Sequence, residues 1–108
     1  MSVAEITSKA DFLAKILNSE DLVVLDCWAP WCGPCKAISP KIEELSQNHT
    51  EAKFYKVDVD QVPDVAQELG IRAMPTIIYF KKGEKYHEVV GANPPAIEAG
   101  VKELIAAA

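Results

Sequence analysis

The segment from residue 22 to residue 35 restricts the possible folds more than any other part of the chain. Leu22–Trp28 is apolar except for one acid, which predicts a buried central strand. The segment Cys32-Gly33-Pro34-Cys35 follows shortly after, and proline is well suited to the first turn of a helix. A buried strand that leads into a helix requires a fold in which helices cover a sheet.

The remaining sequence alternates between helical and strand patterns. We expect helices over residues 8–17, from 34 onward, 63–69 and 95–107, and strands over residues 22–28, 53–59, 76–80 and 86–90, with a short further strand at 3–6. The first helix has one apolar face, made by Phe12, Leu13, Ile16 and Leu17. Pro40 falls inside the second helix and should kink it. The order of elements predicts the α/β class, with a central mixed sheet flanked by helices on both faces.

Composition excludes several classes of protein and partner. The 108 residues are 49% hydrophobic, enough for one domain over residues 1–108 with a single core. The net charge is −5 and no basic cluster occurs, which argues against a nucleic-acid partner. Residues 1–8 lack the features of a signal peptide, and no apolar run approaches the length of a membrane span. Three cysteines are too few for a disulfide-stapled secreted scaffold, so we expect a cytoplasmic protein without a membrane partner.

Two cysteines separated by two residues can close into a disulfide and open again, which makes a reversible two-electron redox site. Cys32 would lie just before the first helical turn, where unpaired N–H groups and the helix dipole favour a thiolate. Cys32 is therefore the candidate nucleophile, and Cys35, inside the helix and more buried, is the candidate resolving thiol. Pro34 restricts the backbone between them, and we expect it to favour the reduced dithiol.

A structural zinc site and an inert cysteine pair are the alternatives for this segment. Zinc normally takes four ligands, and the remaining candidates, Cys27, His49 and His87, lack ligand-like spacing. We therefore expect no metal. The buried strand before the pair and the helix after it favour a redox site over an inert one.

Asp26 is the acid in the predicted buried strand, and burial of a carboxylate carries a large desolvation cost. If it is buried, its pKa should be raised, and it could exchange a proton with Cys35. The alternative is a carboxylate at a strand end that reaches water. Lys56 lies in the next predicted strand and would approach Asp26 if the two strands pair, although a solvated lysine at a sheet edge fits the sequence equally well.

Residues 26–36, with the sequence DCWAPWCGPCK, resemble the active-site segment of the thioredoxin family. The resemblance extends along nearly the whole chain. It is carried by Pro40, Lys56–Asp60, Ala73–Thr76, Lys82-Gly83 and Val90–Ala92. Gly91–Pro94 and the absence of a leader are most similar to cytosolic eukaryotic members, of the fungal type.

The resemblance implies a thioredoxin fold and assigns roles to the residues above. It implies Cys32 as nucleophile, Cys35 as resolving thiol, and Asp26 as a buried proton carrier near Lys56. It also implies that Pro75 is cis and lies against the Cys32–Cys35 bridge, since an X–Pro bond is the only common place for a cis peptide. From the residues alone, a trans proline at the start of an edge strand remains open.

The resemblance further implies a shallow apolar groove that holds an extended segment of a disulfide-containing protein substrate. The groove residues are Trp31, Gly33, Pro34, Met74, Pro75, Gly91 and Ala92. The implied partner is thioredoxin reductase, which holds the NADPH that re-reduces the pair. The chain itself has no nucleotide loop, so we expect no bound cofactor besides the Cys32–Cys35 disulfide, and a monomer.

A general protein-disulfide reductase is the function these features favour. Gly-Pro between the cysteines argues against an oxidase or isomerase, and also against a glutaredoxin, a family that usually carries Pro-Tyr there. A binding module that uses the groove without chemistry is the non-enzymatic alternative.

Cys27 departs from the family, which usually carries a larger residue there. We expect Cys27 to be a small buried hydrophobe on the strand face opposite Asp26, with a regulatory disulfide or modification as the alternative.

Overall fold

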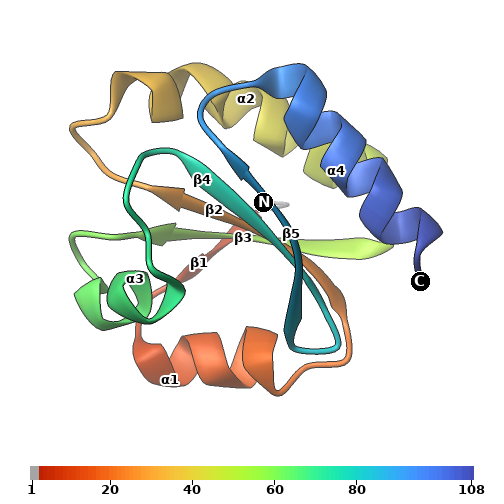
Figure 1. The fold of residues 1–108 in the computed structure, drawn as a ribbon, viewed down its shortest axis with the longest axis horizontal. Helices are drawn as coiled ribbons and strands as arrows, with labels where there is room; N and C mark the ends of the chain where they lie inside the picture. The colour runs from red at the N-terminus through yellow and green to blue at the C-terminus, as the bar shows by residue number, and fades with distance from the viewer. Residues whose placement is uncertain (1–2) are drawn as a thin grey trace.

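A five-stranded sheet forms the centre of the computed structural model, which describes residues 3–108 (Figure 1). Residues 1 and 2, part of the segment in which the sequence predicts no leader, lie outside the described residues. The strands are β1 (Val3–Ile6), β2 (Leu22–Trp28), β3 (Ala52–Asp58), β4 (Thr76–Lys81) and β5 (Glu84–Val90), in the spatial order β1-β3-β2-β4-β5. β1 and β2 run parallel to β3, whereas β4 is antiparallel to β2 and β5, so the sheet is mixed as predicted.

Helices cover both faces of this sheet. They are α1 (Lys9–Phe12), the π-helical turn η1 (Leu13–Leu17), α2 (Gly33–Asn48), α3 (Pro63–Leu69) and α4 (Pro94–Ala106). In Figure 1, α1 and α3 lie on one side of the sheet, and α2 and α4 lie on the other. α2 continues through Pro40, which lies inside it.

The alternation of side chains along β2 gives the protein two cores, one on each face of the sheet. Val23, Leu25 and Cys27 pack on the face that α1 and α3 cover, together with Phe12 and Val65. The second core lies under α2 and α4. It contains Val24, Phe54, Ile77, Tyr79, Ile38, Ile42, Ile97 and Val101, among others. Asp26 falls between Leu25 and Cys27 in this alternation, so it points toward the α2 side.

The helices and strands depart from the predicted boundaries by only one or two residues, mainly at the β4–β5 hairpin. Both strands extend further toward the turn than expected, because the turn needs only Lys82 and Gly83. Both residues have positive φ, 52° and 78°, which is the requirement of the tight hairpin turn that matches strand twist. Leu13 was expected on the buried face of the first helix, but it is 37% exposed. Phe12 and Ile16, four residues apart, are fully buried there, and the winding changes from α- to π-helical at Leu13.

Candidate active site

Cys32 and Cys35 lie at the start of α2, just beyond the end of β2 that carries Trp28. Their sulfur atoms form a disulfide, and the two Cα atoms are 5.3 Å apart, within the usual range for such a bridge. The expectation that Cys35 is more buried than Cys32 is wrong, because both residues are 3% exposed. The backbone N–H of Cys32 donates to the carbonyl of Ala29, so the turn before the helix folds over Cys32.

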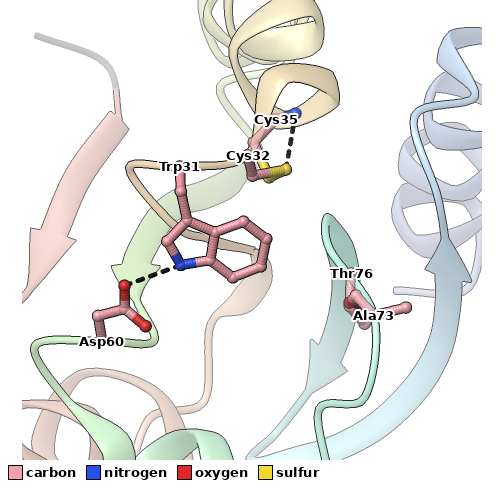
Figure 2. Close-up of a disulfide and its surroundings, with 6 residues drawn as sticks. All are labelled: Trp31, Cys32, Cys35, Asp60, Ala73 and Thr76. Atoms are coloured by element: carbon pink, nitrogen blue, oxygen red, sulfur yellow. Dashed lines mark hydrogen bonds between the residues drawn. A yellow bond between two sulfur atoms is a disulfide. The ribbon is translucent and has the colours of Figure 1, made fainter.

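Cys32 occupies the N-cap position of α2, with Pro34 in the first turn as the sequence predicts. Its Sγ accepts a hydrogen bond from the backbone N–H of Cys35 at 3.1 Å (Figure 2). A side chain at this position normally supplies an oxygen that accepts from the helix N-terminus. Here sulfur takes that place, so the amide and the positive end of the helix dipole favour negative charge on Cys32 when the bridge is open.

Asp26 is buried, with 6% of its surface exposed, so the alternative of a carboxylate in water is wrong. Its Oδ1 has no hydrogen-bond partner among residues 3–108. Burial raises the pKa of Asp26 to about 6, and the positive charge of Lys56 opposes part of that rise. Lys56 is the register partner of Asp26 in the parallel β2–β3 pair, so the predicted approach of the two residues is confirmed. Its Nζ also lies 5.6 Å from the centre of a Trp28 ring.

A pocket of about 600 Å³ joins Asp26 to Cys35 and Lys56. Three residues of α2 that the sequence analysis did not single out also line it: Lys36, Ser39 and Glu43. Their spacing was a usable signal, because residues three, four and seven apart share one face of a helix, and this face begins near Cys35. Lys36 and Ser39 are exposed, so the pocket connects the buried carboxylate with the surface.

Trp31 is 68% exposed beside the disulfide, and its orientation is fixed from the loop after β3. Its indole Nε1–H donates to Oδ2 of Asp60 at 3.0 Å (Figure 2). The N–H of Asp60 in turn donates to Oδ1 of the buried Asp58 at 2.9 Å. Sequence analysis missed Asp60 because 29 positions separate it from Trp31 and only the β2–β3 pairing brings them together.

The Met74–Pro75 bond is cis, so the alternative of a trans proline is wrong. Two hydrogen bonds hold the segment: the hydroxyl of Thr76 donates to the carbonyl of Ala73 at 2.7 Å, and the N–H of Gly91 donates to the carbonyl of Pro75 at 2.8 Å. Figure 2 draws Ala73 and Thr76 on the side of Trp31 away from Asp60. The structure therefore places Pro75 and Gly91, two predicted groove residues, in direct contact.

The other predicted groove residues have open surroundings. Gly33, Pro34 and Ala92 are exposed, and Met74 is half-buried. Across the described part of the chain, no hydrogen bond links Trp31 to the Met74–Pro75 segment. Trp28 is half-buried beneath the site, with no partner for its indole N–H among residues 3–108.

Cys27 is fully buried on the sheet face opposite Asp26, as predicted. It is the one cysteine outside the disulfide, and burial raises the pKa of its thiol far above the ordinary value.

Residues 3–108 contain no group of three or more His, Cys, Asp or Glu side chains placed to hold a metal ion. Within the same range, no helix has both the length and the apolar character needed to cross a membrane.

A mixed sheet between two helical layers, with a disulfide at the start of α2, defines a thiol–disulfide oxidoreductase. A family model described as Thioredoxin matches residues 3–103. "Thioredoxin Asp f 29" of Aspergillus fumigatus is 51% identical over 107 residues, which are 97% of each chain. Thioredoxin-1 of Schizosaccharomyces pombe is 47% identical over 93% of this chain and 96% of its own. The crystal structure of thioredoxin from Malassezia sympodialis superposes with a TM-score of 0.88 at 45% identity, over 94% of this chain and 89% of that one.

The chain belongs to the thioredoxin family, and within it to the fungal type of eukaryotic thioredoxin. The predicted thioredoxin fold is confirmed. The protein is a thiol–disulfide oxidoreductase whose own Cys32–Cys35 pair is the redox-active group, and its activity is that of a protein-disulfide reductase.

Proposed function

We propose that the reaction runs through a mixed disulfide, with Cys32 as the attacking thiolate. Attack of Cys32 on a substrate disulfide forms one new S–S bond and releases the first substrate sulfur as a thiolate. Cys35, as a thiolate, then attacks Cys32 Sγ, which closes the Cys32–Cys35 bridge and releases the second substrate sulfur. The protein loses two electrons and the substrate gains them. The observation that carries this assignment is the hydrogen bond from the Cys35 amide to Cys32 Sγ at the N-cap of α2.

Asp26 is the proposed acceptor of the proton that Cys35 loses in the second step. Its support is the shared pocket, the absence of a fixed partner at Oδ1 among residues 3–108, and a pKa of about 6, close to neutral pH. Lys56 keeps that pKa from rising further, so the carboxylate is ionised and ready to accept at pH 7. The pocket gives the proton a route to solvent past Lys36 and Ser39.

We further propose that the substrate lies as an extended segment across the surface near the disulfide. The proposed contact residues are Trp31, Gly33, Pro34, Met74, Pro75, Gly91 and Ala92. The exposure of Trp31, Gly33, Pro34 and Ala92 supports this role, as does the hydrogen bond that holds Gly91 against the buried Pro75. Backbone hydrogen bonds in the manner of strand addition would bind the segment independently of its sequence.

The partners we propose are disulfide-containing protein substrates and thioredoxin reductase, which would supply electrons from NADPH. We propose that the chain acts as one domain over residues 1–108 and as a monomer in the cytoplasm, in electron transport to protein disulfides. The acidic net charge of −5 supports protein partners over nucleic acid.

A redox titration in dithiothreitol or glutathione buffers, followed by tryptophan fluorescence, tests the proposal. We expect a reversible two-electron transition at about −270 mV, the value already established for thioredoxin itself. A midpoint near about −180 mV, typical of protein disulfide isomerase, would contradict the reductant assignment. Replacement of Pro34 by histidine should lower the midpoint if proline favours the dithiol, because a couple whose reduced form is stabilised has the higher potential.

The proton role of Asp26 has a separate test. The rate of insulin disulfide reduction by the pre-reduced protein should fall as pH drops through about 6, where Asp26 becomes protonated. Asp26→Asn should be slower at neutral pH and should lack that titration. An Asp26→Asn variant with an unchanged pH profile would remove Asp26 from the mechanism.

A further inference from the structure

A second pocket borders the proposed substrate groove and has no role in the chemistry described above. Its volume is about 360 Å³. The lining includes Arg72, Ala73, Thr76, Lys85, Glu88 and Val90. Ala73 and Thr76 are the residues whose hydrogen bond closes the loop around cis-Pro75, and Val90 directly precedes Gly91, which is bonded to Pro75. The groove residues themselves do not line this pocket, but the chain neighbours of Pro75 and Gly91 do, so the pocket lies beside the groove on the Pro75 side.

The charges in this pocket leave one cation without a partner. Lys85 and Glu88 form an ion pair with each other, so their charges offset. Arg72 is exposed and forms no ion pair with any other residue in the described range 3–108. It is also the only arginine of the chain. The pocket thus carries a net positive charge on a protein whose net charge is −5.

We propose that Arg72 binds an acidic side chain of the protein substrate, close in sequence to the cysteine that Cys32 attacks. This proposal rests on the reductase function and the groove proposed above. A guanidinium presents paired N–H donors that match the two oxygens of a carboxylate, which makes arginine well suited to this recognition. Val90, 55% exposed at the same pocket, offers an apolar wall for the carbon chain of that residue.

The preference of Arg72 for an acidic residue should hold on only one side of the substrate cysteine. Arg72 lies at the Pro75 end of the groove, whereas Asp60 lies at the Trp31 end and is itself negative. A carboxylate toward Trp31 would meet like charge and would be disfavoured. Because an extended chain advances about 3.3 Å per residue, the favoured position lies within a few residues of the cysteine.

Stopped-flow measurement of peptide disulfide reduction tests the proposal. The protein is reduced with dithiothreitol and desalted, so no reductase is present, and its tryptophan fluorescence reports the oxidation. The substrates are symmetric disulfides of short peptides with a central cysteine, so either sulfur presents the same sequence. One Asp is placed in turn at each position on either side of the cysteine, and a matched peptide carries Asn at that position.

We expect the Asp peptide to react roughly fivefold faster than its Asn match at one or two positions on one side, which corresponds to about 1 kcal/mol. Arg72→Gln should bring this ratio to about one, and Arg72→Glu should invert it. The ratio is taken within each variant, so a general loss of rate cancels. In about 1 M salt the wild-type ratio should approach one, because the Debye length is then only about 3 Å.

Lys53→Gln is the matched control, because it removes the same charge from an exposed lysine at the far end of the sheet. Lys53 pairs with Val23 in the sheet register, whereas Thr76 at the pocket pairs with Cys27. If the Asp-to-Asn rate ratio fell equally in Lys53→Gln, the effect would come from net charge alone, and the proposal would be overturned. Equal rates for Asp and Asn peptides in the wild type would also overturn it, while the reductase function would stand. If the wild type reduced none of the peptides, the reductase function would fail first and this proposal with it.

Discussion

Replacement of the buried Asp26 by asparagine should stabilise the oxidised protein at neutral pH. The ordinary pKa of an aspartate is 3.8, and burial raises that of Asp26 to about 6 in the folded state. A difference of about two pH units corresponds to roughly 3 kcal/mol, because each unit is worth about 1.4 kcal/mol. The folded state binds the proton more tightly than the unfolded state, so above pH 6 this free energy counts against folding.

Because the pKa of Asp26 is higher in the folded state, the stabilising effect of Asp26→Asn depends on pH. As pH falls through 6 toward 3.8, Asp26 takes up a proton in the folded state first, and the penalty disappears. Asp26→Asn should therefore raise the free energy of unfolding by about 3 kcal/mol near pH 7.5 and by less than about 1 kcal/mol near pH 4. Asparagine has nearly the same shape, and Oδ1 has no partner among residues 3–108 to lose.

Urea unfolding of the oxidised proteins at both pH values measures this difference. Asp21→Asn is the matched control, because Asp21 is an exposed carboxylate just before the other end of β2. Its stability change should stay within about 0.5 kcal/mol at both pH values. A gain in Asp26→Asn of the same size at pH 4 and pH 7.5 would refute burial of the charge as the cause. An absence of any gain at pH 7.5 would refute the raised pKa.

Three further predictions concern packing and orientation around the site. A Cβ on Gly100 of α4 would lie 2.5 Å from Cζ of Tyr79, so Gly100→Ala should lower the free energy of unfolding in urea by about 1–3 kcal/mol; an unchanged midpoint would contradict the close packing. Because Cys27 is buried and the pKa of its thiol is raised, alkylating reagent should modify Cys27 only after the reduced protein is denatured, as mapped by mass spectrometry. Rapid alkylation of Cys27 in the reduced native protein would contradict this. Asp60→Ala removes the hydrogen-bond acceptor of the Trp31 indole, so acrylamide quenching of tryptophan emission should increase while stability changes by less than about 1 kcal/mol. Unchanged quenching would mean that this hydrogen bond does not hold the ring in place.

Local patterns predicted most of the fold because they act over short distances along the chain. The apolar run of Leu22–Trp28 gave the bounds of β2, and Pro34 marked the first turn of α2. The order of strands in the sheet was not predictable in this way, because it depends on which apolar faces pack together after the elements form. The π-helical turn η1 likewise left no separate signal, since its apolar spacing also fits an α-helix.

The same distinction between local sequence patterns and long-range packing applies to the candidate site. Cys32, Cys35 and Asp26 were predictable because their chemistry is unusual for their local setting. Trp31 was predicted as a groove residue, but its bond to Asp60 depends on the pairing of β2 with β3 and could not be foreseen. The equal burial of the two cysteines also escaped prediction, because it depends on how the turn before α2 folds over Cys32.

The position of α2 links the two halves of the proposed chemistry. Its N-terminus directs the Cys35 amide to Cys32 Sγ, and its side, through Ser39, lines the pocket over Asp26. A helix that moved away from the sheet would admit water to Asp26, lower its pKa and make it a weaker base, and would also shift the amide that stabilises the Cys32 thiolate. The roughly 3 kcal/mol that burial of Asp26 costs is therefore inseparable from the packing that positions the nucleophile. Natural selection for reduction of disulfides would retain this acid even though a neutral residue at the same position would give a more stable protein.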